Sequence, residues 1–163
     1  MLETIIYSNM SNAIIYRDDD PNVYTCLHEF KKVNQWFKDR KLNHTVAVVM
    51  EDLWENHGLF YYLATEPNII VELHGWEHKD YSILSYDECF NDLKKSKEYW
   101  ETNCKRMTGI DKKITTYFAP WNREGDNIKK ACEDLGLRFC ATKDGVWEDN
   151  KIISFHWWSF NGL

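Results

Sequence analysis

The sequence predicts an α/β fold, built as one barrel-like domain around a mostly parallel sheet. Short apolar runs alternate with longer segments of helical periodicity along the 163 residues, as expected for βαβ units. This length fits one hydrophobic core, so we expect a single domain over residues 1–163. Polar residues follow the apolar runs, and α/β proteins carry their sites at the carboxyl ends of parallel strands.

The first half of the chain supplies two strands and two helices. Residues 13–16 form a short apolar run that acidic residues and Pro21 stop, as at the end of a buried strand. Apolar residues recur at helical spacing over residues 25–41, which predicts an amphipathic helix. Residues 45–50 are rich in valine and predict a strand, and residues 51–64 predict a helix that is interrupted near Gly58.

The second half continues the alternation. Ser85 and Glu88 have the spacing of a capping box, which opens a long helix that ends at Gly109. The remaining expected elements are strands at 68–73, 114–119, 138–141 and 152–155, and a helix at 126–135.

Composition narrows the classes of function. The net charge of -6 argues against a nucleic-acid surface, and no apolar run approaches the ~20 residues that cross a bilayer. The five cysteines show no CxxC spacing and are expected to be reduced core residues. The amino terminus does not resemble a signal peptide. We therefore expect a cytoplasmic protein, with release by lysis or incorporation in a virus particle left open.

Polar residues that follow apolar runs could converge on one divalent metal ion, with zinc as the first expectation. They are Asp18, Asp19, Asp20, His74, His78 and His156. A carboxylate and two neutral imidazoles leave positions open for water and substrate, as in catalytic metal sites. We expect Asp19, His74 and His78 to be the ligands, Asp18 to be the general base and His156 to protonate the leaving group. A solvated acidic turn and hydrogen-bonded histidines are the alternative interpretation.

These residues resemble the motifs of the polysaccharide deacetylases, the NodB-homology domains of carbohydrate esterase family 4. Asp18-Asp19-Asp20-Pro21 is similar to the first motif, Asp-Asp-Gly-Pro. Residues 74–78, His-Gly-Trp-Glu-His, are similar to the second motif, His-Ser/Thr-x-x-His. The resemblance assigns Asp18 as the base and Asp19 with the two histidines as the ligands. It also implies a NodB-like distorted (β/α) barrel, reduced in size.

Two later segments extend the resemblance. Phe118-Ala119-Pro120-Trp121 resembles the third motif, Arg-x-Pro-Tyr, which implies that the Trp121 N–H helps to hold the oxyanion. Residues 153–156 resemble the final motif, which ends in the acid histidine, here His156. Phe118 replaces the arginine that orients the catalytic aspartate in the family, and Arg17 or Arg123 could substitute for it. The family's fourth motif is only faintly echoed, by Asp144 and Trp147.

The resemblance implies a metal-dependent carbohydrate deacetylase, which hydrolyses N-acetyl or O-acetyl groups on a glycan such as peptidoglycan. Trp76, Trp147 and Trp157 could stack on sugar rings, although core packing explains such residues equally well. One alternative is a deacetylase-like module that binds glycan without turnover. Another is a zinc peptidase that uses His74-x-x-Glu77-His78, a motif that requires a helix. Gly75 disfavours a helix across this pair.

Overall fold

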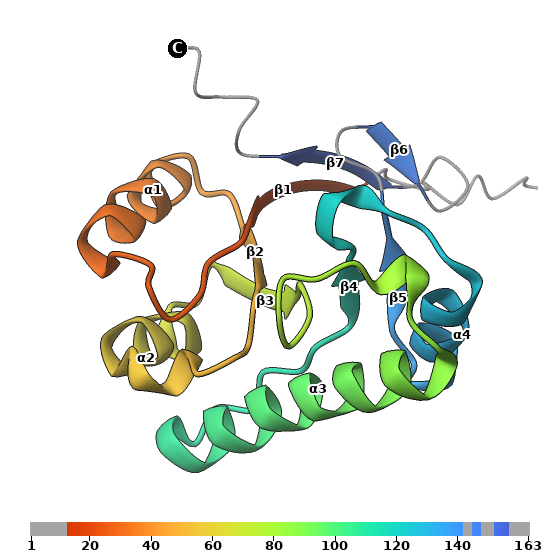
Figure 1. The fold of residues 1–163 in the computed structure, drawn as a ribbon. Coiled ribbons are helices and arrows are strands. Elements are labelled where there is room, and N and C mark those ends of the chain that lie inside the picture. The colour runs from red at the N-terminus through yellow and green to blue at the C-terminus, as the bar shows by residue number, and fades with distance from the viewer. Residues whose placement is uncertain (1–12, 142–144, 148–151, 157–163) are drawn as a thin grey trace, which may run out of the picture.

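The computed structural model describes residues 13–141, 145–147 and 152–156. Its centre is a seven-stranded sheet in the order β5-β4-β3-β2-β1-β7-β6, which curls into part of a barrel (Figure 1). Every pairing is parallel except β6 with β7. The predicted α/β fold with a mostly parallel sheet is therefore confirmed.

The strands follow the predicted alternation, with changes at their ends. Their bounds are β1 Ala13–Asp19, β2 His44–Val48, β3 Ile69–Leu73, β4 Thr116–Phe118, β5 Arg138–Cys140, β6 Gly145–Trp147 and β7 Ile152–His156. Strand β6 was not expected from the sequence. Strand β1 continues three residues beyond the expected run, because it pairs with β2 on one side and β7 on the other.

The helices surround the outside of the sheet (Figure 1). They are α1 Leu27–Asp39, α2 His57–Thr65, α3 Tyr86–Thr108 and α4 Asp126–Asp134. The helix expected over 51–64 is instead a 3₁₀ turn, Leu53–Glu55, followed by α2. The break lies before Gly58, because the Asn56 side chain caps α2 by accepting a hydrogen bond from the Leu59 N–H. None of the helices in the described ranges is long and apolar enough to cross a membrane.

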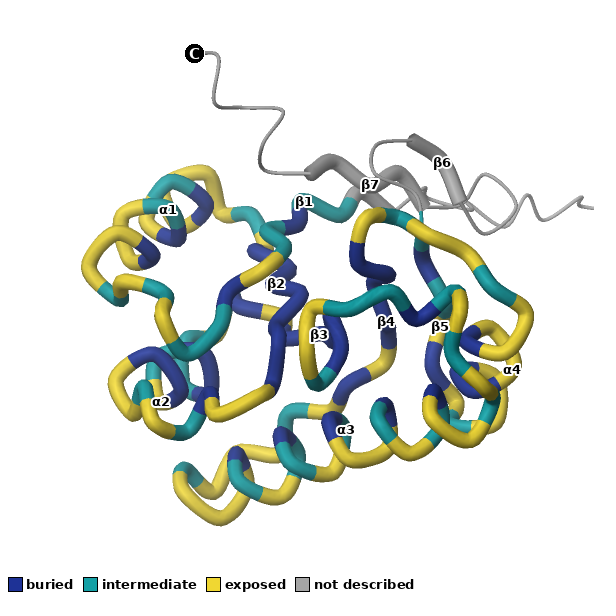
Figure 2. The backbone as a smooth tube through the Cα atoms, in the orientation of Figure 1, coloured by how far each residue is buried: buried dark blue, intermediate teal, exposed yellow. Residues whose placement is uncertain are grey.

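The main core lies between the sheet and the helices, and Figure 2 shows the central strands buried while the outer faces of the helices are exposed. Side chains of β2 and β3, such as Val46 and Val71, pack there with Leu63 of α2 and Trp100 of α3. The opposite face of the sheet has a small second cluster, made of Ala47, Phe118 and Cys140. Side chains alternate between these two faces along each strand, and this alternation determines where the polar residues of β1 point.

Candidate metal centre

Three polar side chains from two strand ends meet at the carboxyl edge of the sheet. Asp20 follows β1 directly, and His74 follows β3 directly, with His78 in the loop beyond it. Strands β1 and β3 both pair in parallel with β2, so their carboxyl ends lie at the same edge. One ligand atom from each of the three side chains lies within 4.8 Å of the others.

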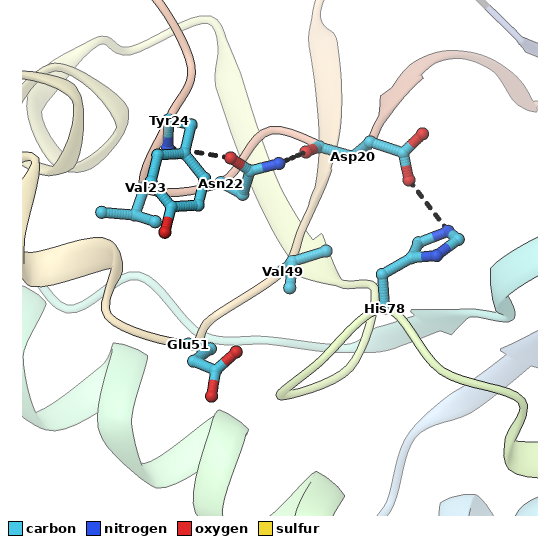
Figure 3. Close-up of a pocket in the computed structure, with 7 residues that line it drawn as sticks. All are labelled: Asp20, Asn22, Val23, Tyr24, Val49, Glu51 and His78. Atoms are coloured by element: carbon cyan, nitrogen blue, oxygen red, sulfur yellow. Dashed lines mark hydrogen bonds and ion pairs between the residues drawn. The ribbon is translucent and has the colours of Figure 1, made fainter.

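The distances suit a shared ion. Oδ1 of Asp20 lies 3.1 Å from Nε2 of His74 and 3.1 Å from Nε2 of His78, and Figure 3 shows the Asp20–His78 contact. Ligand atoms about 2.1 Å from a zinc ion lie roughly 3.4 Å apart in a tetrahedral arrangement. Only a small outward shift of the side chains would therefore admit an ion.

The environment of His74 fixes its tautomer. The ring is buried, and the Phe118 carbonyl oxygen lies 2.8 Å from Nδ1. A carbonyl oxygen can only accept, so Nδ1 carries a hydrogen and donates it. In the neutral ring the Nε2 lone pair then faces the Asp20 carboxylate, an arrangement that requires a cation or a proton between the two atoms. A backbone partner of this kind also orients histidines that bind metals.

His78 is the more exposed histidine of the pair, and its surroundings favour the neutral ring. Burial lowers the pKa of His78, as does the nearby His74, while the charges of Asp20 and Asp19 act in the opposite direction. The His78 and Trp121 rings are nearly perpendicular, with ring centroids 4.5 Å apart. A neutral imidazole is the form that binds metals, so these surroundings fit the donor set.

Asp19 lies on the other side of strand β1 from Asp18, beside a buried arginine. Arg17 and Asp19 share a face of the strand, and the Arg17 guanidinium lies 3.4 Å from the Asp19 carboxylate. The guanidinium also donates to Oδ1 of Asn122 at 3.1 Å, and it covers the Phe118 ring at 4.7 Å. Asp19 is thus held by Arg17, and Asp20 takes the place beside the histidines that the sequence motif assigns to Asp19.

Asp18 points to the helix-covered face of the sheet. Its carboxylate lies 3.8 Å from Nε2 of His44, a buried histidine whose ring stacks on Phe37 at 4.1 Å. Burial lowers the pKa of His44 to about 3, which keeps this ring neutral. This contact places the Asp18 carboxylate on the face of the sheet that α1 covers, opposite to the face that carries Asp19.

The turn after β4 is strained and lies beside the candidate centre. Trp121 and Asn122 have φ angles of 52° and 55°, a left-handed conformation that asparagine tolerates but that a bulky residue such as tryptophan rarely adopts. The turn places the Trp121 ring on His78 and the Asn122 amide on Arg17. Strain of about 1–3 kcal/mol per residue is typically retained where it positions functional groups.

The remaining predicted residues are distributed as follows. Strand β7 places the backbone of His156 in register with Arg17, next to the site, although its side chain is outside the described part of the chain. The Trp76 ring packs on α3, against Tyr99 at 5.3 Å and under the Lys95 amine, which is a packing role. The side chain of Trp147, and Asp144 and Trp157 entirely, fall outside the described residues. Arg123 pairs with Asp80 rather than with a catalytic aspartate.

A cavity of about 320 Å³ opens beside the cluster (Figure 3). Asp20 and His78 lie on one side of its lining, Tyr24 and Glu51 on the other, and Val49 between them. Tyr24 in this lining is 92% exposed, and Trp121, which contacts His78, is 55% exposed. The candidate centre is therefore accessible to solvent, because the Asp20 and His78 side chains are 50% and 32% exposed.

No protein-family model and no curated protein matches this sequence, whereas solved structures match its fold. A carbohydrate esterase family 4 pseudoenzyme from Bacillus anthracis has a TM-score of 0.69 at 15% identity, over 90% of this chain and 55% of its own. Peptidoglycan deacetylase PdaC from Bacillus subtilis has a TM-score of 0.58 at 15% sequence identity, and the match covers 80% of this chain and 58% of PdaC. The fold is that of the family 4 carbohydrate esterases.

A third match is the Xyl-CE4 domain of a multidomain xylanase from the hindgut metagenome of Trinervitermes trinervoides. Its TM-score is 0.62 at 12% identity, over 90% of this chain and 74% of that domain. This chain thus spans little more than half the length of the pseudoenzyme and of PdaC. The predicted NodB-like barrel of reduced size is confirmed at the level of the fold.

Sequence reasoning missed Asp20 as the carboxylate beside the histidines. It named Arg17 only as one of two possible substitutes, with Arg123, for the arginine of the third motif. The signal for both was present in the strand periodicity. If β1 extends to Asp19, then Arg17 and Asp19 share one face and Asp18 takes the other. The motif match placed the family's glycine position at Asp20, so Asp20 was not considered as a partner of the histidines.

Proposed function

We propose that this chain is a metal-dependent hydrolase that removes acetyl groups from a glycan, acting as one catalytic domain. The observation that carries the proposal is the convergence of Asp20, His74 and His78 beside an aspartate that a buried arginine holds. A bound divalent ion, with zinc as the first choice, would polarise the acyl carbonyl and lower the pKa of a water molecule. The fold of the family 4 carbohydrate esterases supports the choice of an acetylated glycan as substrate.

We propose that the two aspartate roles each lie one residue later than the motif resemblance assigns them, while the two histidines keep their role as ligands. Asp20, His74 and His78 would hold the ion, and Asp19 would accept the proton of the attacking water. The charge of Asp19 raises the pKa of His78, against the larger effect of burial, and this supports a role for Asp19 beside the centre. Asp18, on the opposite face with His44, is then a packing residue.

Arg17 is proposed to orient Asp19, in place of the arginine that Phe118 replaces. Its guanidinium is fully buried and is held by Asn122 and by the Phe118 ring. A cation at this position attracts the Asp19 carboxylate and restricts its rotation, which suits a general base. The phenylalanine that departs from the motif thus supplies the surface on which the substitute arginine rests.

The groups that act on the leaving amine and on the oxyanion are assigned from the sequence motifs and from the register of β7. His156 ends β7 next to Arg17, and an imidazole there would protonate the departing amine. The N–H of Trp121 would help to hold the oxyanion, and the exposed Trp121 ring would contact a sugar. Trp147 and Trp157 are retained as candidate sugar contacts, and Trp76 is assigned to packing.

Acetate release from N-acetylglucosamine oligomers tests this proposal. We expect metal-free protein to release no acetate and added zinc to restore hydrolysis. An Asp111→Asn variant serves as the control. It changes an exposed aspartate that pairs with Lys113 and takes no part in the proposed site, so it should release acetate like the wild type. If the zinc-bound protein bound the oligosaccharide but released no acetate, the hydrolase proposal would be rejected.

A glycan-binding module without turnover is the second candidate, because one structural neighbour is a pseudoenzyme of the same fold. Retained oligosaccharide binding without hydrolysis is the outcome that favours it. The zinc-peptidase alternative is disfavoured by the backbone. The segment from His74 to His78 is not helical, and Gly75 has a φ of 105°. Glu77 therefore does not share a helix face with the two histidines.

A further inference from the structure

The loop that carries the histidine pair has an unusual shape at Gly75. This residue has a φ of 105°, and a Cβ atom added to it would lie 2.5 Å from the Tyr81 hydroxyl oxygen. The hydroxyl therefore occupies the space that a side chain at position 75 would need. Tyr81 itself is 2% exposed, so its ring is fixed in the core beneath the loop.

The Tyr81 hydroxyl and the Asp92 carboxylate hold the backbone between the two histidines. The Trp76 N–H lies 3.1 Å from the hydroxyl oxygen and 3.0 Å from Oδ1 of Asp92. The hydroxyl also lies 2.6 Å from the same Asp92 oxygen and 3.2 Å from the Glu77 carbonyl oxygen. One phenol and one carboxylate thus contact two successive residues of the loop.

Asp92 connects this network to the longest helix. It lies in α3, whose start is fixed by a complete capping box at Ser85 and Glu88. Its second carboxylate oxygen lies 2.6 Å from the Lys79 amine, so the carboxylate also holds the residue that follows His78. The loop is therefore bound to a rigid element at residues before and after His78.

His78 has few other constraints. Its side chain is 32% exposed, and among the described side chains it contacts Asp20, His74 and Trp121. Its position relative to His74 is therefore determined mainly by the backbone of the loop between them. Groups that hold a ligand-bearing loop affect metal affinity without contacting the ion.

We propose that Tyr81 and Asp92 are positioning residues that set the separation and orientation of the two histidines at the metal centre. The inference rests on the proposed metal site and adds two residues to it that no motif indicated. Tyr81→Phe removes the hydroxyl while retaining the ring, and Asp92→Asn retains an acceptor oxygen but removes the charge opposite Lys79. Both changes should alter metal binding while His74, His78 and Asp20 remain in place.

The test is the binding of zinc and of cobalt(II), the latter followed by its visible absorption spectrum. We expect zinc affinity to fall by about 10–100-fold in each variant, with a changed cobalt spectrum because the ligand geometry is altered. Tyr86→Phe is the matched control. It also removes a hydroxyl that donates to a carboxylate, that of Asp134 at 2.8 Å, between α3 and α4.

Each outcome distinguishes this inference from the proposed function. Wild-type zinc affinity and an unchanged cobalt spectrum in Tyr81→Phe would overturn the inference and leave the metal site standing. If Tyr81→Phe does not fold, the same readouts on Asp92→Asn decide the matter. Failure of the wild-type protein to bind either metal would overturn the inference together with the proposed function. A loss of affinity in Tyr86→Phe equal to that in Tyr81→Phe would show a general effect of stability and would also overturn it.

Discussion

At the scale of single residues, three consecutive aspartates have three different environments. Asp18 faces the helix-covered side of the sheet beside His44, and Asp19 faces the opposite side beside Arg17. Asp20 lies beyond the strand with a φ of 74°, a conformation that aspartate tolerates, and this turns its carboxylate toward the histidines. The alternation of a β-strand separates side chains that are adjacent in sequence.

The roles of the first two aspartates can be separated by matched substitutions. Asp19→Asn should lower kcat by about 10²–10⁴-fold, because an amide cannot accept the proton, and zinc binding should persist. Asp18→Asn should leave kcat within a few-fold of wild type. Acetate release at saturating zinc measures both. A large loss of kcat in Asp18→Asn with little loss in Asp19→Asn would restore the assignment that the motif suggests.

The Arg17–Asp19 pair should show strong coupling in stability. Arg17→Met leaves a nearly buried carboxylate without its cation, which typically costs about 3–5 kcal/mol. The double variant Arg17→Met/Asp19→Asn should lose less stability than the sum of the single variants, because neither charge then remains unpaired. Urea unfolding of all four proteins provides the measurement. Additive losses would show that the pair contributes no coupling.

At the scale of elements, the length of strand β1 is what moved the site assignment. Three adjacent aspartates have low strand propensity, so the sequence predicts that the strand ends at residue 16. Strand β1 continues because β2 and β7 pair with it on both sides, down to the register pairs Asp19 with Ala47 and Arg17 with His156. Long-range pairing of this kind is not encoded in the local pattern.

The packing of α1 on β2 predicts a pH-dependent stability. His44 is buried between aromatic rings of α1, including Phe37, and its pKa is lowered to about 3 in the folded protein. The unfolded chain takes up a proton near pH 6.5, so stability should fall as pH decreases from 6.5 toward 3 and should be unaffected above that range. Between pH 7.5 and 5 the loss from this residue alone is about 2 kcal/mol.

A variant without the titrating group isolates this contribution. His44→Gln retains a donor for the Asn34 amide oxygen, which lies 3.2 Å from Nδ1 of His44, but it has no ionisable ring. The difference in unfolding free energy between wild type and His44→Gln should therefore change by about 2 kcal/mol between pH 7.5 and 5. Parallel pH profiles for the two proteins would contradict a neutral, buried His44.

At the scale of the whole molecule, periodicity predicted the fold better than the site. Alternating strands and helices indicated a parallel sheet, and the capping box at Ser85 marked the start of α3 correctly. The 3₁₀ turn before α2 is held in part by a contact distant in sequence, the hydrogen bond from the Trp54 N–H to the Tyr99 hydroxyl. Strand β6 is only three residues long and carries too little periodicity to be recognised, although its partner β7 is close in sequence. The histidine pair was found because both of its members belong to one local motif. Asp20, Arg17 and the Tyr81 network depend on which face of an element a residue occupies.

The whole arrangement can be understood as one edge of a parallel sheet on which several strand ends converge. Strand β1 supplies Arg17 and Asp19, and the turn after it supplies Asp20. The loop after β3 supplies the histidines, and the strained turn after β4 supplies Trp121 and a support for Arg17. The central claim is that Asp20, His74 and His78 hold a divalent ion at this edge.

Zinc binding by wild-type protein and by an Asp20→Ala variant, measured by isothermal titration calorimetry, tests that claim most directly. Wild type should bind one equivalent of zinc, and Asp20→Ala should lose most of that affinity, because a ligand carboxylate is removed while Asp19 remains paired with Arg17. Full retention of zinc affinity in Asp20→Ala, or no binding by the wild-type protein, would contradict the account.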